Sequence, residues 1–117
     1  MTMYIDFEVG QSRTTQSASD YLMFGCMPGG FLEAVLCNDL FRASNNADHQ
    51  NREILANIAF SVFQNFPNGS FGNEQIMMDW VRDVDGRRAA WALAAEKAYT
   101  WRVLKGEEDE NAPRPTF

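Results

Sequence analysis

The groups with the widest chemical range in this sequence are one imidazole, two thiols and a few helical carboxylates. His49 is the only histidine, so any Ser–His–Asp or Cys–His catalytic arrangement would have to use it. It stands beside Asp48 in the expected first turn of a helix, which is an ordinary solvated position. We expect a surface histidine without a catalytic role, and a single histidine also disfavours a His-rich metal site.

The two cysteines, Cys26 and Cys37, are spaced neither for zinc nor as a redox Cys-x-x-Cys pair. We expect two reduced and mostly buried thiols. Gly29-Gly30 belongs to no phosphate-binding glycine motif, because no strand precedes it and no Lys-Ser/Thr pair follows it. It predicts a tight turn that starts a helix with its backbone close to a neighbouring element.

Four acidic side chains could act together as a general acid and base or as magnesium ligands. They are Glu33, Asp39, Asp48 and Glu53. Their spacing does not force them together, and acids on helices usually cap an end or face solvent. We therefore expect no catalytic residues, no metal, no cofactor and no enzymatic activity.

Asp39 differs from the other acids because it falls on the apolar side of an expected central helix. Burial of a carboxylate is costly unless it meets a cation or a backbone N–H group. Arg42, Arg52 or a helix N-terminus could supply that partner. A buried tie between helices is the leading interpretation, and a contact with a partner protein is the alternative.

Composition describes a single compact domain. The chain has 117 residues, of which 45% are hydrophobic and 22% charged, enough to bury a core without a metal or disulfide. We assign residues 1–106 to one helical domain and residues 107–117 to a flexible acidic tail. The net charge is −6, to which the tail contributes −3 through four acids and one arginine. This acidity disfavours direct nucleic-acid binding, which needs clustered Lys and Arg.

Two further features concern location. No apolar run is long enough for a membrane span, and the N-terminus lacks the basic start typical of a signal peptide. We expect no membrane contact and a cytoplasmic location.

Hydrophobic periodicity predicts a mainly α fold of four to five helices with a short N-terminal strand or extended arm. Residues 3–9 alternate apolar and polar side chains. As a strand they would have to pair with a partner or with a second copy of the chain. Residues 10–19 are polar and predict a loop, followed by a short helix from Ser19 or Asp20 to Phe24.

Three longer helices are expected at residues 31–43, 48–64 and 74–105. The first is apolar almost all round, so we expect it at the centre of the domain. The second begins with Asp48 as its N-cap and ends at a turn of residues 67–70. The third keeps one apolar stripe across Gly86, and Arg87 and Arg88 would be unfavourable in a new first turn, which favours one long helix over two. The face buried by the second helix is expected to hold Ile54, Leu55, Ile58, Ala59 and Val62.

Apolar residues that fall off these stripes are the best candidates for a binding surface. Coverage of these residues by the N-terminal arm is the equal alternative. The acidic tail is a second candidate contact, for a basic partner. The candidate partner-binding residues are Phe60, Leu93, Trp101, Leu104 and Asp39, with Glu107 and Glu108 of the tail.

The central residues resemble a motif of small tailed-phage and prophage accessory proteins. PGGFLEAVL at residues 28–36 is followed by Asn38-Asp39-Leu40, Ala47-Asp48 and Asn51, and the pattern continues to Pro67, Gly72 and Trp80. The match covers residues 21–80, about half of the chain. That family has no assigned activity, so the resemblance implies only where the protein comes from and where it acts. It implies a phage accessory protein that acts inside an infected bacterium.

Small acidic phage proteins are often inhibitors that bind a host enzyme or a defence complex, anti-CRISPR proteins included. The resemblance therefore implies an interaction protein in the host bacterial cytoplasm that inhibits a defence system or another host factor by stoichiometric binding. The alternative is a small oligomeric virion-assembly or structural protein. A monomer or a homodimer would support the inhibitor, whereas a stable ring or larger oligomer would support the assembly role.

Overall fold

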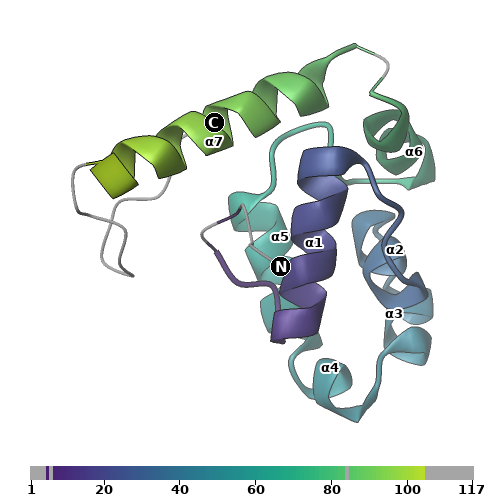
Figure 1. Cartoon of the computed structure of the whole chain (residues 1–117). Helices are drawn as coiled ribbons and strands as arrows, with labels where there is room; N and C mark the ends of the chain where they lie inside the picture. The colour runs from purple at the N-terminus through teal and green to yellow at the C-terminus, as the bar shows by residue number, and fades with distance from the viewer. Residues whose placement is uncertain (1–4, 6, 84, 105–117) are drawn as a thin grey trace.

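The computed structural model describes residues 5, 7–83 and 85–104, and for residues 97–104 it describes the backbone alone. Over these ranges the chain forms helices and no strand (Figure 1). The prediction of a mainly α domain is confirmed, although the helices are shorter and more numerous than the four or five expected. The proposed boundary at residue 106 and the acidic tail lie outside the described residues. The helices are α1 (Ser12–Phe24), α2 (Gly30–Leu36), α3 (Leu40–Asn46), α4 (His49–Glu53), α5 (Leu55–Asn65), α6 (Glu74–Arg82) and α7 (Arg87–Leu104).

In the view of Figure 1, α1 runs through the middle of the molecule, with α5 to its left and α2 and α3 to its right. It also contacts α6 and α7. The predicted loop at residues 10–19 is therefore wrong, as is the helix start at Ser19 or Asp20. The periodicity of large apolar residues did not predict this helix, because its first turns bury small or β-branched side chains instead. Such side chains allow close packing. The buried residues of α1 are Thr14, Thr15, Ala18, Ser19, Tyr21, Leu22 and Met23.

The described residues of the segment before α1 form neither helix nor strand within the chain and pack against it as an arm, while pairing with a partner or a second copy stays a prediction. Ser61 Oγ of α5 donates to the Glu8 carbonyl oxygen at 2.6 Å. The backbone N–H of Val9 donates to Thr15 Oγ1 of α1 at 2.9 Å. These bonds fasten the arm across α1 and α5, and its apolar side chains are buried there, namely Ile5, Phe7 and Val9.

The helix predicted at residues 31–43 is interrupted. Its first half is α2, and Asn38 then adopts a left-handed conformation with φ 60° before α3 begins. The interruption turns Leu40 and Phe41 outward, to 65% and 88% exposure. The segment is therefore not the fully buried centre that its composition indicated, although Leu32, Ala34, Leu36 and Ala43 are buried.

The helix predicted at residues 48–64 is present as two pieces, α4 and α5, which meet at Ile54. Asp48 is the N-cap, as predicted, because its Oδ1 accepts from the backbone N–H of Asn51 at 2.7 Å. Ile58 and Val62 are buried as expected, whereas Ala59 is exposed. The predicted turn at residues 67–70 is also present.

The single helix predicted at residues 74–105 is wrong: α6 ends at Arg82 and α7 begins at Arg87. Asp83 takes the left-handed conformation, with φ 54°, and Gly86 follows with φ 77°. Arg87 Nε lies 2.6 Å from Asp85 Oδ2, so the acid that precedes the first turn of α7 offsets the positive charge within it.

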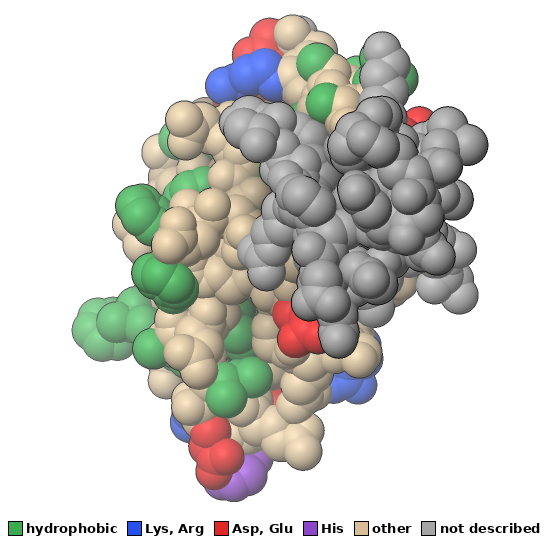
Figure 2. Space-filling model, turned by 90° about the vertical axis from the view of Figure 1, so that its left-hand side faces the viewer, with side chains coloured by type: hydrophobic (Ala, Val, Ile, Leu, Met, Phe, Trp, Pro, Cys, Tyr) green, Lys and Arg blue, Asp and Glu red, His purple; other side chains and the backbone are tan. Residues whose placement is uncertain are grey.

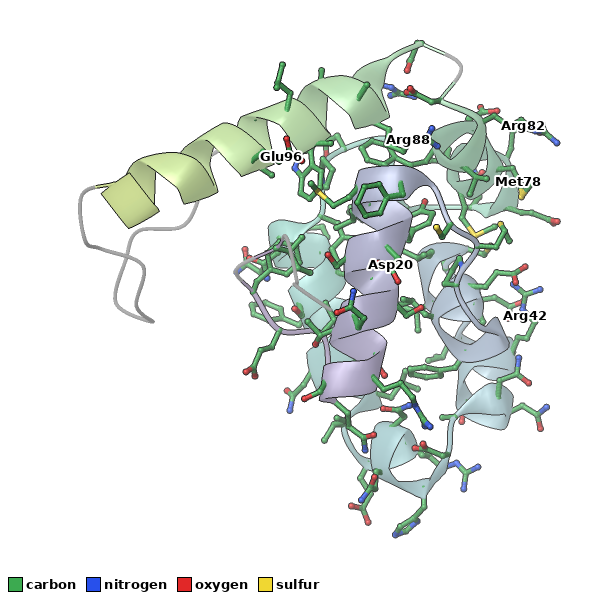
Figure 3. The ribbon with its side chains drawn as sticks, viewed as in Figure 1. Asp20, Arg42, Met78, Arg82, Arg88 and Glu96 are labelled. Carbon is green, nitrogen blue, oxygen red and sulfur yellow. The ribbon has the colours of Figure 1, made fainter. Side chains whose placement is uncertain are left out.

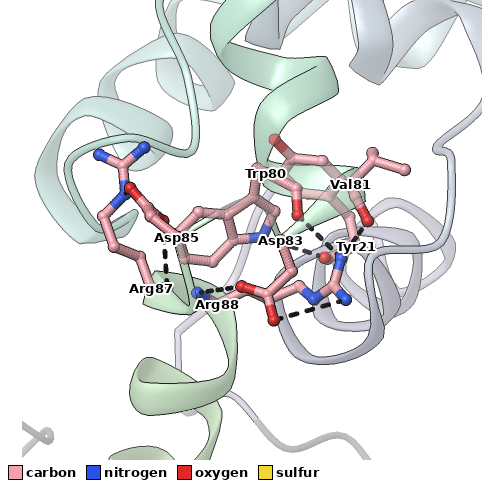
Figure 4. A network of polar contacts seen from close by, with 7 residues as sticks. All are labelled: Tyr21, Trp80, Val81, Asp83, Asp85, Arg87 and Arg88. Atoms are coloured by element: carbon pink, nitrogen blue, oxygen red, sulfur yellow. Dashed lines mark hydrogen bonds and ion pairs between the residues drawn. The ribbon is translucent and has the colours of Figure 1, made fainter.

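Arg88 joins the two helices (Figures 3 and 4). Its Nη1 donates to the carbonyl oxygens of Trp80, at 2.8 Å, and Val81 at the end of α6, where the Trp80 carbonyl also accepts from the backbone N–H of Asp83 at 3.1 Å. Its backbone N–H donates to Asp83 Oδ1 at 3.2 Å. The two arginines that argued against a helix start here are thus held by acids and carbonyl groups of the preceding turn.

Candidate partner-binding surface

Large hydrophobic side chains are exposed at several points of the described surface. The most exposed are Phe41 at 88% and Phe63 at 73%. Figure 2 shows hydrophobic side chains gathered along one side of the face in view, with charged groups above and below them. Grouped apolar side chains, unlike single ones, mark interaction sites. The exposed large hydrophobic residues are Phe24, Met27, Leu40, Phe41, Phe60, Phe63 and Leu93.

Helix α5 presents an outward face without charge. None of its residues carries a formal charge. Its exposed apolar residues follow the i, i+3, i+4, i+7 spacing of one helix face, and we call them the α5 face: Ala56, Ala59, Phe60 and Phe63. A helix at the surface of a domain normally places charged or polar residues there. The α5 face therefore has the composition of an interface.

A groove of about 350 Å³ lies next to the α5 face, between α5 and the segment of α2 and α3. Its apolar lining includes Val35, Leu40 and Ala43 from one side and Leu55, Ala56 and Ala59 from the other. Ala56 and Ala59 belong to both the groove and the α5 face, so the two form one continuous apolar surface.

Asp39 is the one charged residue that lines the groove. The prediction that it forms a buried tie between helices is wrong, because it is exposed and caps α3. Its Oδ1 accepts from the backbone N–H of Arg42 at 3.0 Å, and its Oδ2 lies 3.7 Å from Arg42 Nε. The break at Asn38 explains the error, since it places Asp39 at a helix start rather than on a buried helix face.

Of the other predicted contact residues, only Leu93 has a side chain that the structure describes. Leu93 is 53% exposed on α7 and does not line the groove. The side chains of Trp101 and Leu104 lie outside the described residues, as do Glu107 and Glu108. Those four assignments stay predictions.

Phe63, Leu40 and Phe41 are surface residues that were not among the candidate contacts. Leu40 and Phe41 belong to the helix that was expected at the buried centre, and Phe63 belongs to neither the expected buried face nor the candidate set. Residues 54–65 contain two phenylalanines and no charged residue. This feature of the sequence alone would have indicated the α5 face.

The histidine and the two cysteines, His49, Cys26 and Cys37, do not line the groove. His49 is exposed on α4, with Nε2 3.0 Å from Glu53 Oε1. Cys26 is exposed, so the prediction of two mostly buried thiols is wrong for it. Cys37 is partly buried, which raises the pKa of its thiol, and its Sγ lies 3.8 Å from Met77 Sδ. Within the described ranges, no group of three or more His, Cys, Asp or Glu side chains could hold a metal ion.

Comparison with known proteins adds no relative. No family model, no curated protein and no solved structure matches the chain. In the part of the chain that the structure describes, no helix combines the length and the apolar character needed to cross a membrane. The geometry of the apolar surface is therefore the basis for assigning a function.

Proposed function

We propose that this protein is a small interaction protein that binds a partner protein stoichiometrically through the α5 face and the adjoining groove. The observation that carries the proposal is the exposure of Phe60 and Phe63, 61% and 73%, on a helix without a charged residue. Full burial of one phenylalanine side chain contributes about 1.5 to 3 kcal/mol. Two such rings in one patch can therefore act as the anchors of an interface.

The surface also indicates the chemistry of the partner. Its apolar centre requires an apolar counterpart, such as a helix with side chains spaced to enter the groove. Asp39 places a carboxylate at the groove, and the chain carries a net charge of −6. A partner with basic residues around its apolar contact is therefore favoured, and the rate of association should fall as salt rises.

The biological role we propose is inhibition of a bacterial defence system or another host factor, which is the role that the resemblance to phage accessory proteins implies. Binding would act by steric occlusion, because a partner surface that covers the α5 face is closed to its own substrate or subunit. A virion-assembly component is the second candidate. It is favoured by the absence of charge on α5, since two copies could pack their α5 faces together without repulsion between like charges.

The test uses the full chain, tagged and added to lysate from bacteria that carry a defence system. Three forms are compared: the unaltered chain, the double variant Phe60→Asp/Phe63→Asp, and Leu93→Asp. Leu93 is the matched control, because it is a similarly exposed apolar residue on another helix. The mass of each purified complex is measured by light scattering.

The proposal predicts one complex of fixed stoichiometry that forms with the unaltered chain and with Leu93→Asp but not with the double variant. Recovery of the chain alone as a defined oligomer that the double variant disrupts would support the assembly role instead. A complex that forms equally with the double variant would rule out the α5 face as the binding site.

A further inference from the structure

The turn between α5 and α6 contains an asparagine that is followed directly by a glycine. The turn spans residues 67–70, and the backbone N–H of Ser70 donates to the Pro67 carbonyl oxygen at 3.2 Å. Gly69 has φ 93°, the positive value that the third residue of a type II turn adopts. Asn68 precedes it, and the Asn68 side chain is exposed.

The fold favours glycine at position 69 for two reasons. Its positive φ is unfavourable for a residue with a Cβ. A Cβ at this position would also meet the guanidinium carbon of Arg87 at 2.8 Å, closer than packed atoms approach. Asp85 holds that guanidinium in place, since its Oδ2 lies 2.6 Å from Arg87 Nε (Figure 4). The turn therefore selects the residue type that leaves its own backbone nitrogen least hindered.

We propose that Asn68-Gly69 is a site of spontaneous covalent modification, at which Asn68 is converted to aspartate and isoaspartate. The Gly69 nitrogen attacks Asn68 Cγ. As the new N–Cγ bond forms, the bond from Cγ to the side-chain nitrogen breaks, and that nitrogen leaves as ammonia with the proton of the Gly69 N–H. The product is a five-membered cyclic imide.

Water then opens the imide at either of its two carbonyl carbons. Addition at Cγ gives aspartate. Addition at the main-chain carbonyl carbon of residue 68 gives isoaspartate, in which the main chain runs through Cγ. The complete reaction consumes water and releases ammonia, so it needs no oxidant, reductant or enzyme.

The described contacts leave this reaction open at Asn68 and block it at a second exposed asparagine. The Gly69 N–H donates to none of the residues that the structure describes. Asn57 is also exposed, but the N–H that follows it belongs to Ile58 and donates to the Ile54 carbonyl oxygen at 3.0 Å within α5. The branched side chain of Ile58 adds a steric barrier. Asn57 is therefore the matched control within the same chain.

The isoaspartate product affects the fold, because it adds an atom to the main chain close to a core contact. Ser70 is fully buried, and its carbonyl oxygen accepts from the Tyr21 hydroxyl at 2.5 Å. Extra length at position 68 displaces Ser70 and weakens that bond. Aspartate leaves the main chain unchanged and adds only a negative charge. The modification is independent of the proposed partner binding, because Asn68 neither belongs to the α5 face nor lines the groove.

The test follows the unaltered full chain during incubation in buffer slightly above neutral pH. Trypsin releases residues 53–82 as one peptide, which lies between Arg52 and Arg82. Fragment masses within this peptide distinguish Asn68 from Asn57. Conversion of the amide to the acid is expected at Asn68 about tenfold faster, or more, than at Asn57. Equal rates would overturn the proposal, and so would conversion of Asn68 only after urea has unfolded the chain.

Two variants separate the added charge from the longer main chain. Asn68→Asp carries the aspartate product alone, and Asn68→Gln cannot form the five-membered ring, so it should keep its amide during the same incubation. The isoaspartate form, isolated from the aged chain by reversed-phase chromatography, should melt a few degrees below Asn68→Asp. Equal melting temperatures would overturn the predicted effect on Ser70. Loss of the amide from Asn68→Gln as fast as from the unaltered chain would overturn the cyclic route.

Discussion

Phe60 and Phe63 lie one turn apart on α5, and both are more than half exposed. The opposite side of the same helix buries Ile58 and Val62 in the core. α5 is therefore apolar on two sides, a pattern typical of a helix enclosed by other elements. In this chain only one side is enclosed by the described residues, and the other is the surface to which we assign partner binding.

The exposed rings should contribute little to folding. Phe60→Asp/Phe63→Asp is expected to change the free energy of unfolding by less than about 0.5 kcal/mol per site, because surface substitutions away from caps and core contacts have small effects. Ile58→Ala, on the buried side of α5, should cost about 2 to 5 kcal/mol. Urea denaturation of the three proteins measures both values. A loss above about 2 kcal/mol in the double variant would show that these rings are covered in the free protein.

Gly25 should tolerate substitution less well than Gly86. Both have positive φ, 70° and 77°, which strains any residue with a Cβ. A Cβ on Gly25 would overlap the guanidinium of Arg88, whereas nothing lies within 4 Å of a Cβ on Gly86. Gly86→Ala should therefore cost about 1 to 2 kcal/mol from backbone strain alone.

Gly25→Ala should cost about 1 to 3 kcal/mol more than Gly86→Ala, because displacement of Arg88 also leaves the Val81 carbonyl group without its donor and the Trp80 carbonyl group with the Asp83 N–H alone. Thermal unfolding of both variants gives the difference. Equal losses would mean that Arg88 does not hold the end of α6 to the start of α7.

Asp39 should behave as a helix cap. Asp39→Ala is expected to destabilise the fold by about 1 kcal/mol, the usual effect of removing an N-cap acceptor. Asp39→Asn keeps a capping oxygen and should restore most of that loss. Chemical denaturation of both variants provides the measurement. A loss of several kcal/mol in both variants would instead support a buried ion pair, which the exposed position of Asp39 contradicts.

Tyr21 should make the fold sensitive to alkali. Burial raises the pKa of its phenol, and the O–H donates to the Ser70 carbonyl oxygen at 2.5 Å. The folded-state pKa thus exceeds the unfolded value of about 10. The contribution of Tyr21 is therefore complete below about pH 10 and is lost as the pH rises toward the folded-state pKa.

Tyr21→Phe removes the titrating group and should flatten this alkaline loss. It should also lower stability near neutral pH by about 1 to 2 kcal/mol, since the Ser70 carbonyl loses its donor. Urea unfolding at about pH 8 and about pH 11 compares the two proteins. The same alkaline loss in both would assign it to other groups.

The helical class of the domain could be predicted from periodicity, and so could the Asp48 cap and the buried Ile58 and Val62. The breaks at Asn38 and Asp83 could not, because each uses a left-handed residue other than glycine. That conformation costs about 1 to 2 kcal/mol and must be held by contacts outside the helix that it ends. Arg88 is such a contact, since it binds the end of α6 from the next helix.

The candidate surface was predictable in part. Phe60 falls off the buried stripe of its helix, and that spacing alone places it outside. Leu40 and Phe41 are expected to be buried only if residues 31–43 form one continuous helix, which the break at Asn38 prevents. Helix α1 could not be predicted from periodicity, because its packing depends on small side chains such as Ala18 and Ser19. Small side chains contribute little to a pattern of hydrophobic residues.

The most direct test of the central claim is calorimetric titration of the captured partner with the unaltered chain and with Phe60→Asp/Phe63→Asp, at two temperatures. We expect binding of fixed stoichiometry to the unaltered chain with a negative heat-capacity change, which is the mark of apolar burial. We also expect an affinity lower by a factor of about 100 or more for the double variant, from the loss of two buried rings. Equal affinities would contradict the claim that the α5 face is the binding surface.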